Sequence, residues 1–136
     1  MLQRIQTIWL FLAGACALLS IKFPIYSGAQ ANNTLYQEIT GTVTIPILML
    51  TVAIGVLAFL AIFMYTNRKL QFRLCLIGII LEVILIFLYY TKINEYETGT
   101  FSLTAVLHAL VLLFFFFAAR GIRADDRIVR ESNRLR

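Results

Sequence analysis

Four apolar segments, each about long enough to cross a membrane, constrain this chain more than any other feature. About 20 apolar residues in a helix, with a rise of about 1.5 Å each, cross the roughly 30 Å of hydrocarbon in a bilayer. Strands of a membrane barrel would be about half as long and would alternate apolar with polar residues. The remaining choice is four transmembrane helices, over residues 5–23, 43–66, 70–91 and 101–119.

The composition and the short connections indicate how these helices are arranged. Hydrophobic residues make up 60% of the chain and charged residues 14%, whereas soluble domains average about 45–50% and about 25%. The connections at residues 24–42, 67–69 and 92–100 are short and polar, and short connections make consecutive helices antiparallel neighbours. We therefore predict an all-α fold, in which residues 1–119 form an antiparallel bundle of four transmembrane helices.

Basic residues are divided unevenly between the two sides of the predicted bundle. Ten lie on the side that holds both termini and the 67–69 turn, whereas the other side holds only Lys22 and Lys92. Because loops rich in lysine and arginine stay in the cytoplasm, both termini are predicted to be cytoplasmic. The expected location is a bacterial inner (cytoplasmic) membrane.

Two further signals lie near the edges of the bundle. The first segment is predicted to be a retained helix and not a cleaved signal peptide, because apolar residues continue past the small residues at 13–15 as far as Phe23. Tyr89 and four other tyrosines gather near the outer side. Such a cluster is typical of an aromatic belt at the membrane interface.

Glu82 is an ionisable residue near the middle of the third segment, and such a residue is costly in a bilayer and marks a candidate functional site. His108, the only histidine, lies at a depth that differs from that of Glu82 by only about 3 Å at 1.5 Å per residue. Since these helices are antiparallel neighbours, we expect Glu82 and His108 to form a hydrogen-bonded pair. Thr51 and Cys16 come at similar depths and complete a candidate polar layer.

The positions of these residues around their helices support the same pairing. Cys75, Gly78 and Glu82 share one face of the third helix, and His108 and Ala109 share a face of the fourth with other small residues. Two interpretations of the pair stay open. It fixes helix register, as buried polar groups do in other proteins, or it titrates during transport. We favour the structural interpretation, because proton pathways usually use chains of such groups.

Residues 120–136 form an arginine-rich tail that is predicted to continue the fourth helix into the cytoplasm. Its arginines recur at spacings of three and four, which places them in one stripe on a helix; they are Arg120, Arg123, Arg127, Arg130 and Arg134. The stripe is predicted to bind anionic lipid headgroups or an acidic partner, because arginine favours specific contacts to carboxylate and phosphate. DNA is not an expected partner, and RNA is the least favoured alternative.

The chain offers little for catalysis or for a cofactor. One histidine and two separated cysteines, Cys16 and Cys75, do not supply the four ligands of a zinc site. No glycine-rich phosphate loop follows a strand, and no nucleophile lies near a base in a recognisable frame. We therefore expect no metal, no cofactor and no enzymatic activity.

Three stretches carry a resemblance to a known family. The start MLQRIQT, the segment KFPIYSG at residues 22–28 and the tail segment IRADDRIVR at residues 122–130 resemble small four-helix membrane proteins of Bacteroidota. That family is catalogued as a domain of unknown function, number 4293. The resemblance runs along the chain and implies a bacterial inner-membrane location, but it implies no activity and no catalytic residues.

Small size, minimal loops and the arginine stripe lead to two functional hypotheses. The first is an accessory or structural subunit of an inner-membrane protein complex, with a membrane protein or a second copy of the chain as its partner. The alternative is a small transporter or proton-coupled protein that uses Glu82 and His108. A membrane enzyme ranks third, because active sites need several convergent polar groups.

Overall fold

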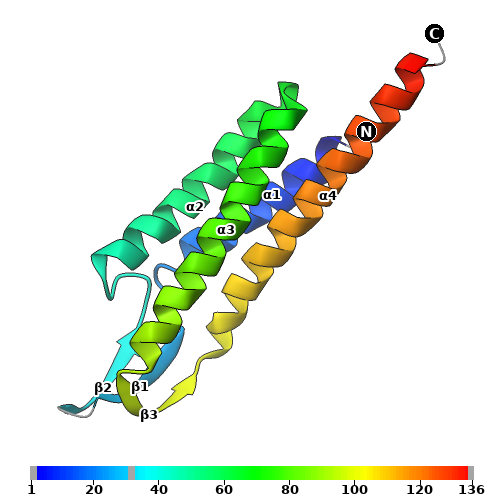
Figure 1. Ribbon diagram of the computed structural model, residues 1–136. Helices are drawn as coiled ribbons and strands as arrows, with labels where there is room; N and C mark the ends of the chain where they lie inside the picture. Colours follow the sequence, from blue (N-terminus) through cyan, green and yellow to red (C-terminus); the bar gives the residue numbers. More distant parts are fainter. Residues whose placement is uncertain (1–2, 31–32, 135–136) are drawn as a thin grey trace.

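The computed structural model describes residues 3–30 and 33–134, which form four helices and one small sheet (Figure 1). The helices are α1 (Gln3–Leu19), α2 (Ile45–Phe63), α3 (Arg68–Ile93) and α4 (Val106–Arg134), and the strands are β1 (Tyr26–Gln30), β2 (Asn33–Ile39) and β3 (Tyr96–Phe101). Short 3-10 turns at Met64–Thr66 and Leu103–Ala105 precede α3 and α4. The last helix runs without a break from the apolar segment into the arginine-rich tail.

The four helices form an up-and-down bundle in which each helix packs against two others. α1 packs against α2 and α4, and α3 packs against the same two. Consecutive helices run in opposite directions, so the start of α1, the α2–α3 turn and the end of α4 lie at one end (Figure 1). We call this the basic end, because it carries Arg68, Lys69, Arg73 and the arginines of α4. The three strands lie at the opposite end, which we call the sheet end.

Three of the four helical regions are long and apolar enough to cross a membrane. They are Ile45–Thr66, Arg68–Ile93 and Leu103–Ser132, whereas the apolar helix Ile5–Leu19 is shorter. The chain leaves α1 at Leu19 although its apolar residues continue to Phe23. It forms backbone turns there instead, such as the hydrogen bond that the Ile21 N–H donates to the Leu18 carbonyl.

The all-α prediction is wrong at the sheet end, where both polar connections contain strands. β1 lies between β2 and β3, and both pairs are antiparallel. Tyr26 is paired with Ile39 on one side and with Phe101 on the other. Tyrosine, threonine, isoleucine and phenylalanine favour strands. The up-and-down topology brings the two connections to the same end, where their backbone groups can pair.

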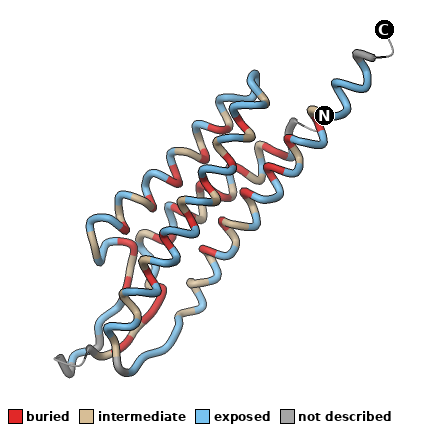
Figure 2. The backbone as a smooth tube through the Cα atoms, viewed as in Figure 1, coloured by how far each residue is buried: buried red, intermediate tan, exposed pale blue. Residues whose placement is uncertain are grey.

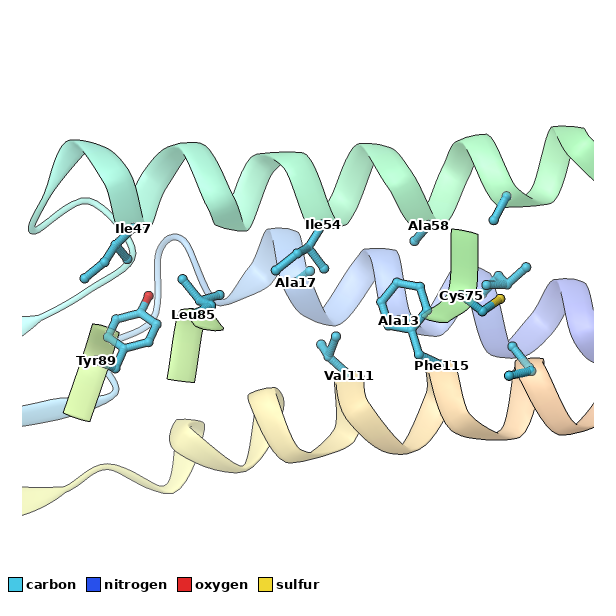
Figure 3. Packing of buried hydrophobic residues seen from close by; sticks show 14 of the residues in the cluster. Ala13, Ala17, Ile47, Ile54, Ala58, Cys75, Leu85, Tyr89, Val111 and Phe115 are labelled. Atoms are coloured by element: carbon cyan, nitrogen blue, oxygen red, sulfur yellow. The ribbon is translucent and has the colours of Figure 1, made fainter. Parts of the chain in front are cut away.

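The core is formed by buried residues, which recur along each of the four helices (Figure 2). Small residues let α1 and α2 approach closely, and they include Ala13 and Ala17 on α1 and Ala58 on α2 (Figure 3). Larger side chains, such as Leu85 on α3 and Phe115 on α4, fill the space from the other two helices. Most of the remaining large apolar side chains of the helices are exposed, and a lipid bilayer can cover them.

Candidate functional site

Glu82 on α3 and His108 on α4 meet in the interior of the bundle. The Nδ1 atom of His108 lies 2.6 Å from the Oε1 atom of Glu82. Glu82 is 0% exposed and His108 is 5% exposed. The structure thus brings together the two residues that the depth argument paired.

A contact of this length holds one proton, and that proton can belong to either group. If Glu82 is ionised, the Nδ1–H of His108 donates to the carboxylate. If Glu82 is protonated, its O–H donates to Nδ1, and the other ring nitrogen, Nε2, then carries the hydrogen of the neutral imidazole. The pair can therefore exchange a proton internally without moving its heavy atoms.

The helix spacing at the pair is set one turn away, at Gly78. A Cβ atom added to Gly78 would lie 2.7 Å from the Phe115 ring, which is closer than carbon atoms pack. Cys75, Gly78 and Glu82 are all buried, as the shared face predicted. The missing side chain at Gly78 lets the Phe115 ring lie against the α3 backbone, and this close approach puts Glu82 within reach of His108.

The other two members of the expected polar layer do not hydrogen-bond to the pair. Thr51 is fully buried, but its hydroxyl donates to the Ile47 carbonyl of its own helix at 2.7 Å. Cys16 is only partly buried and packs against the apolar core. Ala13 and Ala17 occupy the inward face of α1, so Cys16 lies at the edge of that face.

Tyr89 belongs to this site, although the sequence placed it in the interfacial belt. It is 3% exposed, and its ring centroid lies 5.1 Å from that of His108. Its hydroxyl points toward α2 (Figure 3) and lies near Thr51 and Glu82, yet it meets hydrogen-bond geometry with neither. The signal was its spacing, because Glu82, Leu85 and Tyr89 recur at three and four residues on the buried face of α3.

Several polar atoms of this site have no hydrogen-bond partner among the described residues. They are Oε2 of Glu82, Nε2 of His108 and the hydroxyl of Tyr89. A buried polar atom without a partner costs about 1–3 kcal/mol. The site therefore combines one strong internal contact with three unused hydrogen-bonding positions.

The prediction that Ala109 lies on the inward face of α4 is wrong. That residue is exposed, whereas His108, Val111 and Phe115 are buried at spacings of three and four. Ala109 follows His108 directly, so it lies about 100° further round the helix, away from the buried face. It lines, with His108 and Tyr89, a mainly apolar cavity of about 290 Å³ between α3 and α4 near the sheet end.

The arginine stripe lies at the basic end, and its members have different surroundings. The guanidinium of Arg123 lies 4.5 Å above the centre of the Phe72 ring on α3. Arg130 pairs with Asp126 at 3.0 Å and Arg127 with Glu131 at 3.7 Å, and both pairs join residues four apart on the helix. Arg120 is exposed and lines a groove against α3. The side chain of Arg134 lies outside the described residues.

One ion pair at the basic end was missed in the sequence. Arg68, at the start of α3, lies 3.4 Å from the Asp125 carboxylate and also donates to the Asp125 carbonyl at 3.3 Å. Asp125 is 9% exposed. It continues the buried series Phe115, Ala118 and Ile122 at spacings of three and four, and this series could have revealed that Asp125 faces inward.

Comparison with known proteins places the chain in a family. The domain of unknown function DUF4293 matches residues 2–135. The chain belongs to the DUF4293 family. No curated protein and no solved structure matches it. The candidate sites of this DUF4293 protein are therefore inferred from its own structure. Within residues 3–30 and 33–134, no three histidine, cysteine or acidic side chains gather as metal ligands would.

Proposed function

We propose that this protein is an accessory subunit of an inner-membrane protein complex, without catalytic activity of its own. It crosses the membrane four times, with the basic end in the cytoplasm. The excess of basic residues at that end supports this orientation. α1 supports a fourth crossing, since its 17 residues span about 25 Å and it packs beside the longer helices α2 and α4.

The projecting end of α4 carries the subunit proposal. Residues 127–132 are all exposed, beyond the point where Arg68 fixes α4 to α3. Ile128 is 51% exposed and Val129 is 40% exposed. These apolar side chains lie outside the apolar segment of α4 and beside exposed arginines. A helix that offers both kinds of group is suited to bind a partner protein.

The chemistry of the tail indicates an acidic partner surface. All basic residues of the tail are arginine, whose planar guanidinium group can bind a carboxylate through two parallel hydrogen bonds. The i,i+4 pairs with Asp126 and Glu131 hold the helix together, but each leaves guanidinium donors unused. An acidic patch next to a small apolar pocket would complement this helix.

The proposal is tested by purifying the tagged protein in mild detergent at its native expression level and identifying what copurifies. A stoichiometric membrane protein is expected. Replacing Arg127 and Arg130 by lysine keeps the charge but removes the bidentate geometry, and it should lower recovery of the partner several-fold. A protein that purifies alone, or only with further copies of itself, would contradict the subunit proposal.

A matched control separates the tail from general charge effects. Lys22 and Lys92 lie at the sheet end, and their replacement by arginine changes geometry without changing charge. That variant should keep the partner. Equal recovery for the tail variant and the wild type would mean that only net charge matters at the tail.

The second candidate, a small proton-coupled transporter, is favoured by the contact between Glu82 and His108. The 2.6 Å contact, and the Nε2 atom of His108 that has no hydrogen-bond partner among the described residues, are features that a proton-transfer site needs. Proton flux into vesicles that hold the purified protein tests it. Loss of flux in a well-folded Glu82→Gln variant would support this candidate, whereas absence of flux in the wild type would reject it.

A further inference from the structure

The basic end contains a groove between α3 and α4 that shares only Asp126 and Arg130 with the tail surface of the subunit proposal. Its volume is about 450 Å³, and it is lined by the first turns of α3 and by the part of α4 that follows the apolar segment. Five of its lining residues are cationic, namely Arg68, Lys69, Arg73, Arg123 and Arg130. The floor is apolar and consists of Phe72, Leu76 and Ile122.

The charges in this groove are not balanced from within. Asp126 lines the groove and pairs with Arg130, while Asp125 lies beside it and pairs with Arg68. Five cations against these two carboxylates leave an excess of three positive charges. Lys69 and Arg73 are exposed, and neither has an ion-pair partner in the part of the chain that the structure describes. The groove thus presents unpaired cations above an apolar floor.

A second cavity continues the groove toward the middle of the bundle. It measures about 220 Å³ and shares Phe72, Leu76 and Arg123 with the first. Ile79, Phe116 and Ala119, in the apolar parts of α3 and α4, extend its lining, and Arg120 completes it. The groove therefore has a basic part next to an apolar slot on the outer surface of the bundle.

We propose that this groove binds an anionic phospholipid, with the headgroup phosphate on the α3 cations and one acyl chain in the slot. Basic pockets between membrane helices recognise lipid headgroups in this way. A free phosphate or an acidic peptide would use the cations but has no group for the apolar slot. A zwitterionic lipid carries its own ammonium group next to the phosphate, so it would leave the excess positive charge uncompensated.

Arg123 lies at the boundary between the basic part of the groove and the apolar slot, and it lines both. Its guanidinium lies 4.5 Å above the Phe72 ring, which fixes the side chain at the boundary between the basic part and the slot. A cation held on an aromatic face keeps its edge free for hydrogen bonds. Because Arg123 lines both cavities, this edge can donate to the phosphate of a lipid whose acyl chain lies in the slot.

Native mass spectrometry of the purified protein tests the proposal, with dioleoylphosphatidylglycerol, dioleoylphosphatidylcholine and inorganic phosphate as probes. The wild type should retain one phosphatidylglycerol molecule more tightly than any phosphatidylcholine. Replacing Lys69 and Arg73 by glutamine should lower the affinity for phosphatidylglycerol about 25-fold, since each cation near a headgroup contributes a factor of about five. Both side chains are exposed, so the fold should survive.

Two further variants make the test specific. Replacing Lys22 and Lys92 by glutamine removes the same charge at the sheet end, outside the groove, and should leave retention unchanged. Leu76→Trp keeps every charge but fills the junction of the two cavities, and it should also release the lipid. The proposal is overturned if the control variant loses as much lipid as the groove variant. It is also overturned if phosphatidylcholine is retained equally, or if phosphate competes fully while Leu76→Trp has no effect.

Discussion

Helices α3 and α4 bring polar side chains together at two places, and the two places differ in whether the charges are neutralised within the chain. In the interior of the bundle, one acid and one base lie 2.6 Å apart and are almost fully buried. At the basic end, five cations line a groove with one lining carboxylate, and most of them are exposed. The first place is paired within the chain, whereas the second has charge to offer to another molecule.

The difference separates groups that hold the fold from groups that bind. A buried pair loses stability when either member is removed, because the other is left unpaired in a medium of low dielectric. An exposed cation contributes little to stability, since exposed ion pairs are worth about 0–1 kcal/mol. Variants of the pair should therefore change unfolding, and variants of the basic end should change association.

The largest effect is expected for Glu82→Ala, which leaves the His108 ring buried without its partner. We expect a loss of about 3 kcal/mol in unfolding free energy, measured by titrating the purified protein in mixed micelles with a denaturing detergent. Glu38→Ala on the exposed surface of β2 is the control and should change stability by less than about 0.5 kcal/mol.

The double variant Glu82→Gln with His108→Gln makes the prediction sharper. Two glutamines can hydrogen-bond to each other without a charge, so the double variant should be more stable than Glu82→Ala. If the double variant is the less stable of the two, the pair is not the unit that fixes the register of α3 and α4.

Gly78→Ala should have the next largest effect. The added methyl group would lie 2.7 Å from the Phe115 ring and would force α3 and α4 apart, at a cost of about 1–3 kcal/mol. Gly121→Ala is the matched control, because its new methyl group would meet only the flexible Gln6 side chain at 3.0 Å. Alanine also favours a helix over glycine by about 1 kcal/mol, so the control should be neutral or stabilising. Equal losses in both variants would contradict the account.

Arg68→Gln should have a smaller and more local effect. It removes the ion pair that joins the start of α3 to Asp125, for a loss of about 1 kcal/mol or less. Amide hydrogens of α4 near Asp125 should exchange faster, while those near His108 should not change. Arg127→Gln removes only an exposed pair, and its exchange pattern should match the wild type.

The smallest effect is expected for Thr51→Val. The Thr51 hydroxyl donates to a carbonyl that already belongs to its own helix, so its loss should cost less than about 1 kcal/mol. The same mixed-micelle titration measures it. A loss as large as that of Glu82→Ala would show that Thr51 is part of the polar layer after all.

The sequence could predict the pair because helix geometry is regular. A constant rise per residue turns a count from the helix ends into a depth, and this sufficed to match Glu82 with His108. It did not suffice for Thr51, whose buried hydroxyl donates to a carbonyl of its own helix, or for Cys16, which lies at the edge of the inward face of α1. Depth alone does not tell which acceptor a side chain uses or how far it faces inward, because both depend on the neighbours that pack against its helix.

The sheet and the ion pair between Arg68 and Asp125 could not be predicted from residue positions along single helices. β1 pairs with β3, which lies about 70 residues further along the chain. No local sequence pattern predicts a strand partner at that separation. Arg68 and Asp125 lie 57 residues apart and meet only because α3 and α4 pack side by side. Contacts of this kind follow from the assembled bundle and not from any single segment.

The most direct test of the account compares two variants in one copurification experiment. One variant carries Glu82→Gln with His108→Gln, and the other carries lysine at Arg127 and Arg130. Partner recovery per molecule of folded, membrane-inserted protein is measured for each. The account predicts that the first variant keeps its partner and that the second loses most of it. The reverse result would contradict the division between a pair that holds the fold and a basic end that binds.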